Sequence, residues 1–213
     1  MEMIILNVEE IFFRDMYRKI CLLTGASVVD AVNLRDLFDF PPDEKFDGFL
    51  TYAYIDKDAG FTFEILAAAQ LVGERVKTFP VSYKKSVKLK RGQVDDAELK
   101  ILDGEYSVAF RDKIYVINDA HSSDELKEQT RFIKSLDAFR HPDYPDDVVV
   151  YFFGENHQPE LLWARCRSID ENILTGELLN EPHKNFGCHA GDLIKFGLAQ
   201  IGEQNILLYL PTK

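Results

Sequence analysis

The eight residues from Arg140 to Asp147 most constrain what this chain can fold into, because they separate two regions with different sequence patterns. The segment holds two prolines and three aspartates, and proline can neither continue a helix nor donate to a strand ladder. Helix-like and strand-like patterns alternate before the segment, whereas every apolar run after it is short and strand-like. We therefore predict an α+β domain over residues 1–143 and a small β domain over residues 147–213.

The second region contains five short apolar runs separated by turn residues, at 148–153, 161–169, 173–179, 193–196 and 206–210. Short strands at this spacing, with no helix between them, are typical of a strongly bent antiparallel sheet or a barrel. The predicted fold class is α+β, with an N-terminal antiparallel sheet and helices followed by a small all-β C-terminal domain.

Three helices are predicted in the first 140 residues. Apolar residues recur at helical spacing over residues 8–23, and Thr24-Gly25 would end that helix. A shorter helix is predicted over residues 30–38. A Ser-x-x-Glu capping spacing followed by helical periodicity predicts the third helix over residues 123–139.

Two hairpins are predicted in the same region. Residues 49–55 and 61–67 are strand-like, with apolar and polar residues alternating in the second run, and they flank a turn that contains Gly60. A second pair of short runs, at 105–110 and 114–117, flanks Arg111-Asp112-Lys113. Both pairs favour antiparallel strands.

The charge of the chain is acidic but unevenly distributed. The net charge is −11, which disfavours binding to nucleic acid or to an anionic membrane. The window from Lys77 to Arg91 nevertheless holds six basic residues and no acidic one: Lys77, Lys84, Lys85, Lys88, Lys90 and Arg91. We expect this window to be a solvated strand or loop, with a local anion or partner site as the alternative.

Composition also indicates a compartment. No run approaches the 18 or so apolar residues of a membrane span, and the first residues lack the basic region of a signal peptide. Three isolated cysteines suit a reducing environment. We predict a cytoplasmic protein whose partner is another protein, with no nucleic acid and no membrane bound.

Sequence motifs for chemistry are sparse. The chain has no dinucleotide-binding, P-loop, zinc-protease or nucleophile-elbow motif. His183, Cys188 and His189 could bind zinc or form a Cys–His pair, but a metal site would need Cys166 or His157 to join them. We favour packing, and predict no catalytic residue, no metal and no cofactor; an enzyme using this Cys/His loop is the alternative.

Three segments of the second region form a combination: Leu162-Trp163-Ala164-Arg165, then Gly176-Glu177-Leu178-Leu179-Asn180-Glu181-Pro182, then Gly191-Asp192-Leu193-Ile194-Lys195-Phe196. This combination resembles the bacterial YegJ-like domain of unknown function and a related group of bacterial immunity-type domains. The resemblance covers roughly residues 148 to 210. It implies a compact β domain of bacterial origin and no particular reaction.

Five residues of these segments are candidate binding residues: Trp163, Asn180, Pro182, His183 and Asp192. Trp163 is expected to be a buried anchor of the β domain, with an exposed partner contact as the alternative. Gly176 is expected at a bend or a close packing contact.

The function predicted from these observations is that of a non-enzymatic protein-binding module. The acidic charge, the lack of catalytic motifs and the two-domain arrangement favour it. The family resemblance narrows it to an immunity-type protein that neutralises a basic effector, whose association the acidic surface would accelerate. A structural or regulatory accessory protein is a further alternative.

Overall fold

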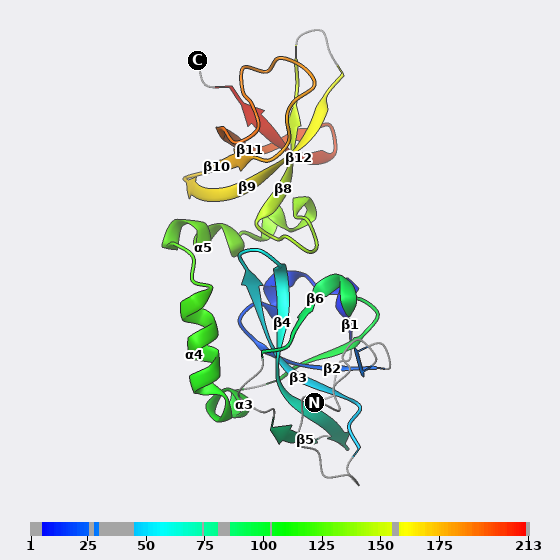
Figure 1. The fold of residues 1–213 in the computed structure, drawn as a ribbon. Helices are drawn as coiled ribbons and strands as arrows, with labels where there is room; N and C mark the ends of the chain where they lie inside the picture. Colours follow the sequence, from blue (N-terminus) through cyan, green and yellow to red (C-terminus); the bar gives the residue numbers. More distant parts are fainter. Residues whose placement is uncertain are drawn as a thin grey trace. The chain divides into compact units, whose positions relative to one another are not determined.

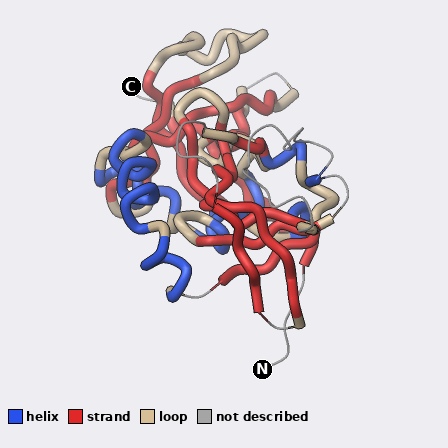
Figure 2. Tube along the Cα trace, turned by 60° about the horizontal axis from the view of Figure 1, so that its bottom comes forward, coloured by secondary structure: helices blue, strands red, loops and turns tan. Residues whose placement is uncertain are grey.

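The structure, a computed structural model, describes residues 6–25, 28–29, 45–73, 75–80, 86–102, 104–154 and 158–211. The chain divides into two compact units, Met1–Ser122 and Ser123–Lys213. Strands make up most of the regular structure in both (Figure 2). The fold is α+β, as predicted from the sequence.

The first unit is built on a seven-stranded antiparallel sheet. Its strands are β1 (Leu6–Asn7), β2 (Ile20–Thr24), β3 (Gly48–Asp56), β4 (Gly60–Val72), β5 (Arg75–Pro80), β6 (Lys88–Lys90) and β7 (Glu98–Leu102). Six of them lie in the order β1-β7-β2-β3-β4-β5, and β6 pairs with β4. Strands β3 and β4 form the first predicted hairpin, with Gly60 at a φ of 78° in the turn.

Side chains alternate between the two faces of this sheet, and both faces are buried. Phe49, Phe61 and Phe63 belong to the larger apolar cluster on one face. Leu50 and Tyr52 belong to a second cluster on the other face. A sheet with two apolar faces needs cover on both, and helices supply it on the second face.

These covering helices stand where the second hairpin was predicted. The prediction of that hairpin is therefore wrong. Residues 105–120 form α3 (Glu105–Ala109) and α4 (Arg111–Ala120), and α4 runs along the sheet (Figure 1). Tyr106, Phe110 and Ile114 pack against the cluster that contains Ile117. Their spacing of three and four residues is that of one helix face, a period masked by the β-branched and aromatic residue types.

The predicted N-terminal helix is also wrong. Residues 8–23 contain two short helical segments, η1 (Val8–Glu10) and α1 (Phe13–Met16), and then β2. Arg18 has a φ of 58°, which interrupts a right-handed helix, and Phe12 is exposed although the pattern placed it on the apolar face. Residues 20–23 are buried because β2 lies between β7 and β3. The helix predicted over residues 30–38 lies outside the described residues.

The second unit is a closed five-stranded barrel, which confirms the predicted all-β region. Its strands are β8 (Asp147–Phe152), β9 (Glu160–Asp170), β10 (Ile173–Leu178), β11 (Leu193–Ile201) and β12 (Gln204–Leu210). Consecutive strands are antiparallel neighbours, and the barrel closes where β12 runs parallel to β8, with Leu208 opposite Tyr151. Phe152 and Phe196 are fully buried in its interior.

Gly176 allows close packing in this barrel, as expected. A Cβ atom at this position would lie 2.9 Å from the Arg165 carbonyl oxygen and 2.9 Å from Phe196 Cε1. The register between β10 and β9 shifts between Thr175 and Gly176. The glycine therefore marks a bulge at which the backbone bends toward its neighbour.

The residues before the barrel belong to the same unit. The helix predicted over residues 123–139 is observed as α5 (Glu125–Arg131) and a 3₁₀ helix, η4 (Lys134–Phe139), with Asp124 rather than a serine at the N-cap. Arg131 Nε and Nη2 donate to both carboxylate oxygens of Asp146, at 2.9 and 2.8 Å. Because this buried ion pair joins α5 to the end of the 140–147 segment, the chain divides at Ser122 and not within that segment.

No helix in the described part of the chain is both long enough and apolar enough to cross a membrane.

Candidate binding site

The loop between β10 and β11 carries four of the five predicted binding residues and is tied to the start of β9. Asn180 Oδ1 accepts a hydrogen bond from the backbone N–H of Trp163 at 2.9 Å. The Leu179 N–H donates to the Trp163 carbonyl at 2.8 Å. The structure thus brings Trp163 and Asn180 together, and Asn180 continues the pairing of β10 with β9 beyond the end of β10.

The other predicted residues also shape this loop. The His183 N–H donates to Glu160 Oε2 at 2.8 Å, and Asp192 Oδ2 accepts from the His189 N–H at 2.8 Å. Pro182 is half-buried beside His183. The side chains of Asn180 and Asp192 accept hydrogen bonds from backbone amides. Such local bonds hold an irregular loop in one conformation.

An exposed ion pair in the same loop was not predicted. Glu181 Oε1 lies 2.7 Å from His189 Nδ1, and Glu181 Oε2 accepts from the Ala190 N–H at 2.9 Å. The hydrogen bond with Glu181 raises the pKa of His189, and the same bond lowers the pKa of Glu181. No sequence signal joined these residues, because their contact depends on the path of the loop.

The Cys/His pair considered as an alternative is not formed. Cys188 is buried and hydrogen-bonds to the hydroxyl of Tyr209, while His189 pairs with Glu181. Burial raises the pKa of the Cys188 thiol, although the bond with Tyr209 opposes that rise. A protonated, buried thiol is a poor nucleophile. Among the described residues no group of three or more side chains could hold a metal ion, and His157 lies outside them.

Trp163 does not occupy the barrel interior where it was expected. Its neighbours Leu162 and Ala164 belong to the buried cluster, so alternation along β9 directs Trp163 outward. It is half-buried, and its ring meets the His141 ring edge-on at 5.3 Å between centroids. The prediction of a core anchor is therefore wrong, because sequence alone did not show which face of β9 points inward.

Trp163 belongs to an apolar patch on the outside of the barrel, which we call the outer apolar face. In register, Leu161 lies opposite Tyr151, Tyr151 opposite Leu208, and Trp163 opposite Val149. Leu161 is 54% exposed. Phe153 is 47% exposed and stacks on Tyr151 at 6.4 Å. The face comprises Val149, Tyr151, Phe153, Leu161, Trp163 and Leu208.

The first unit contains a different kind of polar site, between the β3–β4 hairpin, β6 and α4. Its titratable members, which we call the Asp56 cluster, are Tyr54, Asp56, Glu64, Lys88, Lys113 and His121. Lys88 Nζ lies 2.8 Å from Asp56 Oδ2, and Lys113 Nζ lies 3.5 Å from Glu64 Oε1. The Tyr54 hydroxyl donates to Glu64 Oε2 at 3.3 Å. Both carboxylates are buried.

Burial and pairing shift the pKa values of this cluster in different directions. Burial alone would raise the pKa of Asp56, but the Lys88 ammonium and two backbone amides outweigh it and lower the pKa to about 2. Burial lowers the pKa of His121 more than nearby Asp56 raises it. Burial, together with Glu64 and Asp56, raises the pKa of Tyr54. Because both carboxylates are paired with lysines, we interpret the cluster as an anchor that holds β6 and α4 to the sheet.

Two residues of the basic window have internal roles. Lys88 is the partner of Asp56. Arg91 is buried, and its Nη2 donates to the carbonyl oxygens of Val8, Glu9 and Ile11. Lys88 thus binds the β3–β4 hairpin, and Arg91 binds the N-terminal segment. Lys84 and Lys85 lie outside the described residues.

Comparison with family models, with curated proteins and with solved structures found no match for this chain.

Proposed function

We propose that the protein is a non-enzymatic protein-binding module and that the outer apolar face is its contact surface. The observation that carries this proposal is the register of three adjacent strands, β9, β8 and β12, which places Leu161, Tyr151 and Leu208 side by side on the outside of the barrel. A face built this way is rigid, because every strand that carries it is paired within the closed barrel.

The composition of the outer apolar face supports a protein partner. Tyrosine, tryptophan and phenylalanine are enriched in protein interfaces, and tryptophan and tyrosine carry much of the binding energy there. Trp163 and Tyr151 are partly exposed beside the more exposed Leu161 and Phe153, so each presents some apolar surface to a partner. Contiguous exposed apolar patches on a folded protein mark interaction sites.

Charge supports a basic partner. The net charge of −11 is shared by both units, each of which has more acidic than basic residues. An acidic field attracts a basic protein over a screening length of about 8 Å at physiological salt and speeds association. The internal roles of Lys88 and Arg91 further favour a protein over a nucleic acid. The resemblance of residues 148–210 to immunity-type domains supports a basic effector as that partner.

The test compares capture by the native chain with capture by the variant Leu161→Asp with Phe153→Asp, both exposed positions of the outer apolar face. The matched control is Leu193→Asp with Leu126→Asp, which changes two exposed leucines of the same unit outside the face. A partner identified from a bacterial lysate would be purified and its Kd measured with all three proteins. We expect the face variant to weaken binding at least about 30-fold, from the loss of two apolar contacts.

Salt dependence supplies the second part of this test. Raising the salt concentration should slow association of a basic partner. A purified partner whose affinity is equal for the native chain and the face variant would overturn the choice of surface. Turnover of a small-molecule substrate by the purified chain would overturn the non-enzymatic function itself.

A further inference from the structure

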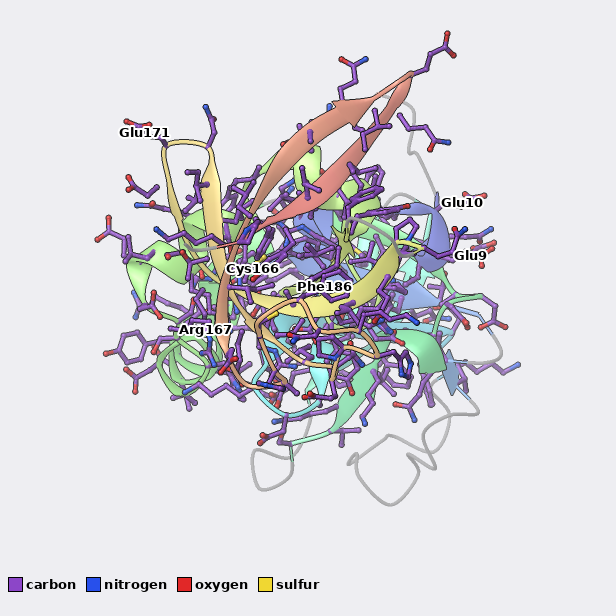
Figure 3. The ribbon with its side chains drawn as sticks, turned by 90° about the horizontal axis from the view of Figure 1, so that it is seen from above. Glu9, Glu10, Cys166, Arg167, Glu171 and Phe186 are labelled. Carbon is purple, nitrogen blue, oxygen red and sulfur yellow. The ribbon has the colours of Figure 1, made fainter. Side chains whose placement is uncertain are left out.

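The β11–β12 hairpin extends beyond the strand that flanks it. Strand β10 pairs with β11 only as far as Ile173 opposite Gly197. From Leu198 to Ile201, β11 continues to pair with β12 on one side and with no described residue on the other. Figure 3 shows this ribbon projecting away from the turn that carries Glu171.

This free edge is short, but it holds no lysine, no proline and no bulge. Proteins blunt exposed edges with lysine, proline or a bulge, because unpaired N–H and C=O groups recruit another strand. The segment reads Leu198-Ala199-Gln200-Ile201, and its register with β12 is unbroken. Leu198 is 48% exposed and Ile201 is 51% exposed. An added strand would gain backbone hydrogen bonds and an apolar contact on each side of the ribbon.

We infer that the free edge of β11 at Leu198–Ile201 binds an extended, basic segment of the protein partner by strand addition. This inference rests on the proposed function and deepens it, because it names the conformation and charge of the segment that is recognised. Strand addition draws affinity from main-chain hydrogen bonds and specificity from alternate side chains.

Charges at the two ends of the edge favour a basic segment. Asp170 ends β9 and Glu171 lies in the turn that follows, next to the beginning of the edge, and Glu203 lies in the turn at its end. The exposed base nearest along the strand is Lys195, two residues before Gly197. An extended segment that carries lysine or arginine would meet carboxylates at both ends.

The same charges disfavour a second copy of this chain as the occupant. Pairing two β11 edges would bring together two proteins of net charge −11. Like charges brought together in an interface destabilise it. A basic partner avoids this repulsion.

The probe is a synthetic peptide of eight alternating valines and lysines with blocked ends. Two control peptides are used. One replaces each lysine by glutamate, and the other carries N-methyl groups on alternate amides, so that one edge of the peptide cannot donate backbone hydrogen bonds. Binding is followed by hydrogen exchange and NMR shifts of the amides of residues 197–202 in the full chain. We expect the lysine peptide to slow exchange of alternate amides there by about tenfold or more, and both controls to bind at least about tenfold more weakly.

A charge-matched pair of variants tests the location. Leu198→Lys with Ile201→Lys places protective lysines on the edge, whereas Leu126→Lys with Phe132→Lys makes the same change at exposed positions at and beside α5. Peptide binding should weaken at least about tenfold in the first variant and stay unchanged in the second. Circular dichroism and Trp163 fluorescence confirm that both variants fold.

Four outcomes would overturn the inference. They are no binding of the lysine peptide, shifts centred elsewhere on the barrel, equal binding of the glutamate peptide, and protection of the edge in the free chain that grows with protein concentration, as pairing of two copies would give. The variant Leu161→Asp with Phe153→Asp separates this inference from the proposed function. It should leave peptide binding intact while it weakens the protein partner, so either proposal can fail alone.

Discussion

The sheet of the first unit and the barrel of the second differ in how many apolar faces they must cover. The sheet has buried clusters on both faces, and α3 and α4 pack on one of them. The barrel has one interior cluster, and its outer face carries half-exposed aromatic residues. In the first unit the polar residues near α4 pair with one another. In the second unit the outward-facing apolar side chains of the strands remain exposed and available to a partner. This difference is the reason for proposing the contact surface on the barrel and not on the sheet.

Within the second unit, a buried ion pair and an exposed one should differ in how much their loss costs. In the second unit the Arg131–Asp146 pair is buried, and removing one partner of such a pair costs about 3–5 kcal/mol. Because Lys127 still pairs with Asp146 in Arg131→Ala, we expect this variant to lower the free energy of unfolding by about 3 kcal/mol, the lower end of that range. The fluorescence of Trp163, the sole tryptophan, reports unfolding of this unit in urea.

The control for this prediction is Arg167→Ala, which removes the exposed ion pair with Glu177 and should cost no more than about 1 kcal/mol. Replacing both buried partners, Arg131→Met with Asp146→Leu, should recover only part of the loss, because Glu128 loses its pair with Arg131 and Lys127 loses its pair with Asp146. Equal losses for Arg131→Ala and Arg167→Ala would contradict the buried role of Arg131.

Backbone packing gives the next effect. Gly176→Ala should destabilise the barrel by about 1–3 kcal/mol, because the added methyl group would lie 2.9 Å from Arg165 and Phe196 atoms. Gly104→Ala in the first unit meets no atom within 4 Å and serves as the control. Urea unfolding followed by circular dichroism measures both. A neutral Gly176→Ala would show that β9 and β10 can separate without cost.

Acid should act on the first unit through Asp56. Its pKa is about 2 in the folded chain, against 3.8 for an unperturbed aspartate, so its contribution is complete above pH 4 and is lost as the pH falls toward 2. The loss is about 2 kcal/mol. Hydrogen exchange of β3 should show this, and Asp56→Asn should flatten the dependence; an unchanged slope in that variant would exclude Asp56 as the cause.

The smallest effect concerns the helix ends. Asp124 Oδ1 accepts from the Lys127 N–H at 2.8 Å and caps α5, whereas α4 begins at Phe110 without a side-chain cap. Asp124→Ala should cost about 1 kcal/mol, measured by Trp163 fluorescence in urea. Asp124→Asn, which can still accept this bond, should be nearly neutral. A full loss in Asp124→Asn would indicate that charge, not the cap bond, is responsible.

Sequence patterns predicted the barrel well because its strands alternate and its turns are local. Residues 148–210 contain no apolar run that also fits a helix. In the first unit, by contrast, Ile20–Leu23 and Tyr106–Ile117 fit both periods, and packing against β3 decided between them. The prediction therefore assigned the strand β2 to a helix, and it assigned the helices α3 and α4 to a hairpin.

The site was harder to predict for a related reason. Trp163 was singled out, but its orientation depends on which residues of β9 face inward. Tyr151 and Leu208 become neighbours only through the pairing of β8 with β12. The Glu181–His189 contact depends on a folded loop. Single-sequence patterns contain none of this long-range register.

The parallel seam between β8 and β12 has a consequence for how the chain folds during synthesis. Its two strands meet at Tyr151 and Leu208, almost at opposite ends of the barrel sequence. Units generally fold in the order in which the ribosome makes them, and long-range pairing is slow. The sheet of the first unit can form while the barrel is still being translated. The barrel can close only after β12 has emerged, and until then the edges of β8 and β11 that β12 covers stay unpaired and can recruit a strand of another chain.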